Sequence, residues 1–136
     1  MSAGHNLDRL AARTAQTIVK QGGDAKKLET LATKALGVMQ ENGVYAGLLF
    51  LYSRTSDDDR RLAKPIRAQL LKLLDSPELG PLDLAFKGEA EGAPWPAVSH
   101  HLITTVTADL YTLLLVKELY EQTLIYVRYG AKAAGG

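Results

Sequence analysis

Residues that usually carry catalysis or bind metal are few in this chain, and they are poorly spaced for either role. There are no cysteines, which excludes disulfides, thiol catalysis and thiolate metal sites. His100 and His101 are adjacent, so on a helix they point about 100° apart and do not easily share a metal ion. No HExxH, P-loop or GxGxxG motif occurs. We therefore expect no enzymatic activity, no bound metal and no cofactor.

Three consecutive acids, Asp57 to Asp59, are the best candidate for a carboxylate site. Carboxylates of this kind can hold Mg²⁺ together with a phosphate. The same acids follow Ser56, a good N-cap residue, and acids suit the positive N-terminal end of a helix. We favour the capped helix start. A magnesium-dependent nuclease or phosphatase is kept as a third hypothesis, behind two binding functions.

Basic side chains recur at helical spacing and point to a binding function. Arg9, Arg13 and Lys20, with Gln16 between them, share one face of the first predicted helix. Long cations along a rigid helix suit the binding of phosphates, which reads charge and shape rather than base sequence. The alternative is an ordinary solvated surface. Further basic residues of this set are Arg60, Arg61, Lys64 and Arg67 in the fourth predicted helix, and Arg128 and Lys132 near the C-terminus.

The charge is unevenly distributed although the net charge is only +1. Residues 1–75 carry 12 Lys and Arg against 8 Asp and Glu, whereas residues 76–98 carry 1 against 4. A basic first half and an acidic loop indicate a protein with one positive face.

The apolar spacing that positions these residues predicts an all-α fold: a compact bundle of five to six helices in a single domain, 1–136. The run 47–52 could also be a buried strand, but no second strand exists to pair with it. Residues 76–98 are expected to form a long loop, with one helical turn at 82–86 and Trp95 pinned to the core. Residues 133–136 are expected to fray. The first predicted helix spans 6–21 and is capped by Asn6, and the second spans 25–41, is capped by Asp24 and ends at Asn42-Gly43. The third spans 44–54, and the fourth runs from Ser56 to before Pro77, with Pro65 either starting its main part or kinking it. The last spans 99–132 and is capped by Ser99, and its weakest part is 104–107.

The N-terminus lacks the apolar core of a secretory signal, and no apolar stretch approaches the roughly 20 residues of a membrane span. The absence of cysteines fits a reducing compartment. We expect a cytoplasmic protein that does not bind a membrane.

Three blocks of sequence carry a family resemblance. They read RLAARTAQTIV near the N-terminus, LATKALGVMQENGVYAGLLFLYSR over 31–54, and LYTLLLVKELYEQTLIYVRYGAK over 110–132. Together they resemble the small-subunit family of type III-B (Cmr) CRISPR effector complexes. In that family a helix leads to an Asn-Gly turn, matched by Asn42-Gly43, and then to an apolar helix that ends in Ser-Lys or Ser-Arg, matched by Ser53-Arg54. The last helix of the family ends in an aromatic, basic segment, matched here by residues 126–129 and Lys132.

The resemblance covers most of the chain apart from residues 76–98. It implies an all-α, non-catalytic subunit that stacks with copies of itself and other effector subunits and contacts guide RNA and target RNA. It places Arg54, Arg128 and Lys132 at the family's basic positions, which adds Arg54 to the candidate RNA-binding residues. The long loop and Pro65 depart from the family pattern, so contacts near them do not carry over. The rival hypothesis is a helical protein–protein adaptor with no nucleic-acid role.

Overall fold

The computed structural model describes residues 3–135, and these residues contain helices but no strand, which confirms the all-α prediction. There are six α-helices and one 3₁₀ helix, so the expected number of five to six is close but not exact. The elements are α1 (Ala3–Gln21), α2 (Ala25–Asn42), α3 (Val44–Tyr52), α4 (Asp57–Leu73), the 3₁₀ helix η1 (Pro77–Leu82), α5 (Trp95–His101) with its π-helical continuation η2 (Leu102–Val106), and α6 (Leu110–Gly135).

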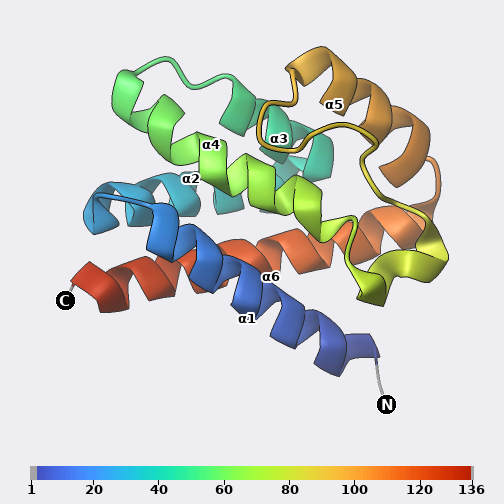
Figure 1. Cartoon of the computed structure of the whole chain (residues 1–136), viewed down its shortest axis with the longest axis horizontal. Coiled ribbons are helices and arrows are strands. Elements are labelled where there is room, and N and C mark those ends of the chain that lie inside the picture. The colour runs from blue at the N-terminus through green and yellow to red at the C-terminus, as the bar shows by residue number, and fades with distance from the viewer. Residues whose placement is uncertain (1–2, 136) are drawn as a thin grey trace.

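The longest helix, α6, is packed against both α1 and α2, as Figure 1 shows. α4 lies beside α1, and the short α3 connects the α2 side of the bundle to α4. One apolar core runs through all these helices. Ile18 of α1, Leu31 of α2, Ile66 of α4 and Leu124 of α6 are each 0–2% exposed.

The starts of α2 and α4 agree with the prediction, because each helix begins directly after its predicted N-cap residue. Asp24 caps α2, since its carboxylate accepts the backbone N–H of Lys27 at 2.9 Å. Ser56 caps α4 by accepting the N–H of Asp59 at 3.1 Å. The break between α2 and α3 falls at Asn42-Gly43, as predicted.

Two boundaries in the first half of the chain differ from the prediction, and one of the two alternatives for Pro65 is decided. α1 begins at Ala3, so Asn6 lies inside the helix and does not cap it. α3 ends at Tyr52, two residues earlier than expected, and the chain turns at Ser53. Pro65 lies inside α4, which runs through it, because Leu62 and Ile66 on the buried face anchor the helix on both sides of the missing N–H.

Residues 76–98 contain more helix than the long loop that the sequence predicts. The helical turn falls at η1 (Pro77–Leu82), not at 82–86, and Asp83 ends it with a left-handed backbone angle φ of 53°. Helix α5 begins at Trp95, four residues before the expected cap at Ser99. Prolines are favoured in the first helical turn, where backbone N–H groups have no helical acceptor, and Pro96 occupies that turn here. Trp95 does pin this segment, since its ring lies 5.3 Å from the rings of both Tyr45 and Tyr52.

The last helical region is divided where the threonines made it weakest. The π-helical turn spans Leu102–Val106, the helix is interrupted at residues 107–109, and α6 starts at Leu110. Asp109 caps α6 by accepting both the N–H and the hydroxyl of Thr112 at 2.9 Å, and these hydrogen bonds lower the pKa of its carboxyl group. Residues 133–135, expected to fray, continue α6, and a Cβ on Gly135 would lie 3.1 Å from Ala25 Cβ. Residue 136 lies outside the described residues.

No helix in residues 3–135 is long and apolar enough to cross a membrane.

Candidate nucleic-acid interface

The three predicted cations of α1 line a groove between α1 and α6. Arg9, Arg13 and Lys20 are exposed, and Gln16 lies between them on the same helix face. The groove has a volume of about 570 Å³ and is called the α1 groove below. Its other lining residues are Ala12, Ala15 and Val19 of α1 and Tyr126 and Gly130 of α6.

Small residues give the α1 groove its shape. α1 is held in place by its buried side, with Leu10, Ala11 and Ile18 in the core. Gly130 lets the backbone of α6 approach closely, because a Cβ there would lie 3.2 Å from Cγ2 of Val19. The floor of the groove is therefore apolar and shallow, and the long cations stand along its α1 side.

Two acids moderate the charge of the α1 groove. The guanidinium of Arg13 donates to the Glu78 carboxylate at 3.3 Å, and the Arg13 side chain remains 58% exposed. Tyr126 donates its hydroxyl to the Asp8 carboxylate, and this hydrogen bond is the main reason that the pKa of Tyr126 is raised. The aromatic ring of Tyr126 lies at one wall of the groove, where a base could contact it.

The first half of α4 brings further cations to the C-terminal end of α1. Gln21, next to Lys20, borders two hollows, one lined by Lys27 and Arg61 and the other by Lys64. Arg60 is exposed on the same helix. The structure therefore brings the α1 and α4 cations together at one end of the pair of helices, which Figure 1 shows side by side.

Two of the predicted RNA-binding residues, Arg54 and Arg67, make contacts with other groups of this chain. Arg54 Nε donates to the carbonyl of Phe50 at 2.9 Å, and its guanidinium lies 3.8 Å from the centre of the Phe50 ring. The guanidinium of Arg67 lies 4.1 Å from the centre of the Tyr52 ring. Both side chains are only partly exposed and hold the end of α3 in place.

Arg128 and Lys132 lie on a different side of α6 from the α1 groove. Relative to Tyr126 they are turned by about 200° and 240° at 100° per residue. Arg128 lies 5.3 Å from the centre of the exposed ring of Tyr129. The structure therefore does not bring the two C-terminal cations together with those of α1.

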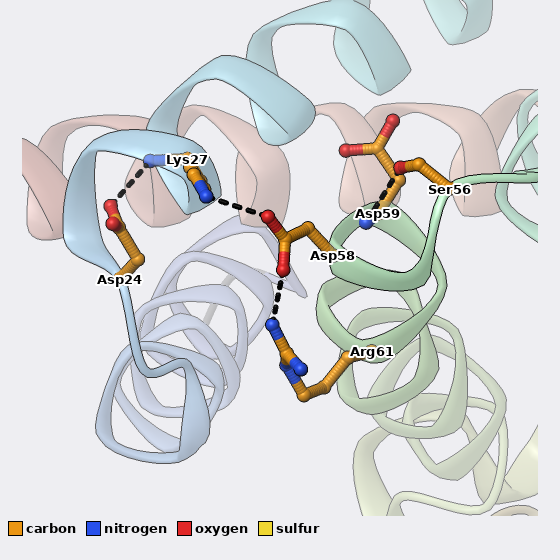
Figure 2. Close-up of polar contacts among 6 residues, drawn as sticks. All are labelled: Asp24, Lys27, Ser56, Asp58, Asp59 and Arg61. Carbon is orange, nitrogen blue, oxygen red and sulfur yellow. Dashed lines mark hydrogen bonds and ion pairs between the residues drawn. The ribbon is translucent and has the colours of Figure 1, made fainter.

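The acids Asp57 to Asp59 form a helix start, as we favoured. Figure 2 shows the Asp58 carboxylate between two cations: Lys27 Nζ donates to it at 2.6 Å, and Arg61 donates to its other oxygen. The hydrogen bond from Lys27 is the main cause of the lowered pKa of Asp58, and it raises the pKa of Lys27 in turn. Asp59 gives its backbone N–H to Ser56. Asp58 is thus engaged in holding α4 to α2.

The histidines are not arranged as metal ligands either. Nε2 of His101 donates to the carbonyl of Leu84 at 2.8 Å, and the His101 ring packs against Phe86. Across residues 3–135, no three His, Asp or Glu side chains are grouped so as to hold a metal ion.

Sequence reasoning missed Gly130, Asp8 and Lys27 as neighbours of the candidate site. Each becomes relevant through a residue far away in the chain: Gly130 through Val19, Asp8 through Tyr126, and Lys27 through Asp58. Helical periodicity relates positions within one helix, so it contains no signal for such pairs.

Comparison with known proteins finds no match to this chain, whether among family models, curated proteins or solved structures.

Proposed function

We propose that this chain is a non-catalytic small subunit of a type III CRISPR RNA-guided effector complex, and that it contacts RNA through the α1 groove. The observation that carries the proposal is the row of Arg9, Arg13 and Lys20, exposed along one groove with an aromatic wall. The three sequence blocks that resemble the Cmr small subunits support the same reading. Guide RNA, target RNA and the other effector subunits are the proposed partners.

The dimensions of the row suit a nucleic-acid strand. Arg9 and Lys20 are eleven residues apart, which is about 16 Å along a helix. A strand of that length presents several phosphates, and the cations can neutralise them without reading sequence. The apolar floor and Tyr126 offer a surface on which an unpaired base can lie. Arg61 and Lys64 extend the positive surface beyond the end of α1, and Arg60 is exposed on the same helix.

Charge removal tests the RNA contact. We expect the triple variant Arg9→Gln, Arg13→Gln, Lys20→Gln to bind single-stranded RNA about tenfold more weakly, since three exposed contacts of about 0.5 kcal/mol each add to that factor. The slope of log affinity against log salt concentration should fall by about 0.7 per lost contact. Fluorescence anisotropy with a labelled RNA measures both quantities.

A matched control removes three cations elsewhere. Lys26, Lys34 and Lys87 are exposed and do not line the α1 groove. Their triple glutamine variant has the same net charge as the test variant, so it should keep near-native affinity. Equal losses in the two variants would mean that RNA responds only to net charge, and the groove would have no role.

Recovery from cells tests the assembly. Tagged protein from its native source should copurify with type III effector subunits and guide RNA, and its gene should lie among genes for such subunits. A gene that stands apart from CRISPR loci, together with copurification of proteins alone, would contradict the proposal.

The adaptor hypothesis is favoured by one specific observation. Ile103, Leu110, Tyr111 and Leu114 are large apolar side chains with at least half of their surface exposed. An adaptor would bury such residues against a protein partner, and its binding would depend little on salt. Salt-insensitive partner binding with no RNA affinity would identify that function.

A further inference from the structure

The outer face of α6 is unusually apolar for a surface that nothing in the described chain covers. Leu110, Tyr111, Leu114 and Tyr129 are 54–69% exposed, and they are four of the six exposed large apolar side chains in the described residues. Exposed apolar side chains that gather on one surface mark interaction sites in soluble proteins.

Three of these residues, Tyr111, Leu114 and Tyr129, share one face of α6 with the partly buried Ile125 and with two charged residues, Glu118 and Lys132. At 100° per residue, the six positions fall within about 60° of the helix circumference. The buried residues of α6, such as Tyr120 and Val127, lie on the opposite side and face α1 and α2. We call these six residues the outer face of α6: Tyr111, Leu114, Glu118, Ile125, Tyr129 and Lys132.

The strip is arranged symmetrically about its centre, between residues 121 and 122. Leu114 and Tyr129 lie about 11 Å on either side of that point, at 1.5 Å per residue. Tyr111 and Lys132 lie about 16 Å on either side. If a second α6 runs antiparallel across the same centre, each Leu114 meets the other copy's Tyr129, and each Lys132 meets a Tyr111 ring, a favourable cation–π partner.

The charges agree with the same arrangement. The acid of the strip, Glu118, lies in its N-terminal half, and the base, Lys132, lies in its C-terminal half. Arg128 lies beside the strip, and the antiparallel pair brings Glu118 within one helical turn of the other copy's Arg128 along the helix axis. Neither residue has an ion pair within the described chain. A parallel pair would instead place the two Glu118 side chains opposite each other and the two Lys132 side chains opposite each other, and both contacts are repulsive.

We propose that a second copy of this chain covers the outer face of α6, as an antiparallel two-fold pair. An isologous contact of this kind uses the same surface on both copies, so this contact by itself joins two copies and no more. The strip is about 32 Å long and one helix wide, which corresponds to a weak, concentration-dependent dimer. The proposal uses none of the α1 groove residues, so it stands or falls apart from the RNA contact.

Single cysteines test the geometry, because the chain has none of its own. With a short thiol-reactive linker, Gln122→Cys should give a covalent dimer by itself, since residue 122 lies at the centre. Leu114→Cys alone should not, because its two copies lie about 22 Å apart along the helices. A mixture of Leu114→Cys and Tyr129→Cys should link to a dimer. Linking of Leu114→Cys to itself, or no linking by any of them, overturns the proposal.

A charge exchange tests the contacts. Glu118→Arg and Arg128→Glu should each weaken the dimer about tenfold in sedimentation equilibrium, because each single change places like charges together in two symmetric places. The double exchange should restore the dimer to within about threefold. The control Lys34→Glu, an exposed change on α2, should have no effect. A double exchange as weak as the single variants, or a monomer at all concentrations, would contradict the pair.

Discussion

The carboxylate of Asp58 accepts hydrogen bonds from Lys27 and Arg61, so a single side chain ties the first turn of α4 to the first turn of α2. It also lies at the positive N-terminal end of α4, where an acid is favourable. The three acids were open to a catalytic interpretation in the sequence, and the contacts of Asp58 give it a structural one. Asp57 lies in the same helical turn and has no ion pair among the described residues.

We expect Asp58→Asn to lower the thermal midpoint at pH 7 and to lose this effect in acid. The neighbouring cations hold the pKa of Asp58 below its ordinary value, so its contribution to stability is present above about pH 4, the usual pKa range of an aspartate in an unfolded chain. That contribution is lost as pH falls through the lowered pKa of the folded state. Thermal melts of wild type and variant should therefore differ at pH 7 and converge as the pH falls below about 4.

Asp57→Asn provides the matched control, because it removes an acid from the same helix turn without removing an ion pair. Its melting difference should be smaller than that of Asp58→Asn at pH 7. If the two variants behave alike, the helix end accounts for the whole effect and the bridge to α2 contributes nothing.

Tyr120 is another residue whose role depends on a distant partner. Its hydroxyl, fully buried, donates to the carbonyl of Leu70 at 2.7 Å. The N–H of Leu74 donates to the carbonyl of Leu71 rather than to that of Leu70. The Leu70 carbonyl at the end of α4 therefore needs another hydrogen-bond donor. Burial raises the pKa of Tyr120 far above its ordinary value, which keeps the hydroxyl available as a donor.

At the scale of the elements, the sharpest constraint is the junction of α2 and α3. Gly43 has φ 94° and ψ −176°, a backbone conformation almost restricted to glycine. Its N–H donates to the Met39 carbonyl at 2.9 Å, and its own carbonyl accepts the N–H of Gly47 at 3.0 Å. One residue therefore ends α2 and begins α3, with no residue between the helices to absorb strain.

We expect Gly43→Ala to lower the free energy of unfolding by about 1–3 kcal/mol, the usual cost of a non-glycine residue in such a conformation. Gly37→Ala, in the middle of α2, is the control. A Cβ at residue 37 meets no atom within 4 Å, so this change should raise stability by about 0.5–1 kcal/mol. Urea denaturation of both variants measures the two effects. A Gly43→Ala protein as stable as wild type would show that the junction can relax.

At the scale of the whole molecule, the N-terminal half of the outer face of α6 lies far from the α1 groove, whereas Ile125 and Tyr129 are next in sequence to the groove residues Tyr126 and Gly130. Leu114 lies twelve residues, or about 18 Å of helix, from the nearest α6 residue that lines the groove, Tyr126. Sites that far apart and without shared partners act additively.

We expect Leu114→Ser to weaken the dimer but to leave the affinity for a short single-stranded RNA within about twofold of wild type. The triple glutamine variant of α1 should behave in the opposite way. Anisotropy and sedimentation on the same four proteins, wild type, each variant and their combination, complete the comparison. A combined variant that deviates from the product of the two separate effects would indicate that the surfaces are coupled.

The sequence by itself determined the helical class, most of the helix positions, the caps at Asp24 and Ser56 and the break at Asn42-Gly43. These features depend on interactions within a few residues: the 3.6-residue period of apolar side chains, the N–H groups exposed at helix starts, and the glycine backbone. The errors fell where two local signals compete, as at Pro96 and Ser99, both of which can begin a helix.

Only the tertiary structure decided which candidate cations share a surface. The sequence offered ten candidate basic residues but could not relate those on different helices to one another. Packing left Arg9, Arg13 and Lys20 along a groove, folded Arg54 and Arg67 onto aromatic rings, and turned Arg128 and Lys132 to another side of α6. The physical reason is that a side chain's periodicity fixes its direction on its own helix, whereas its neighbours across the bundle depend on how whole helices pack.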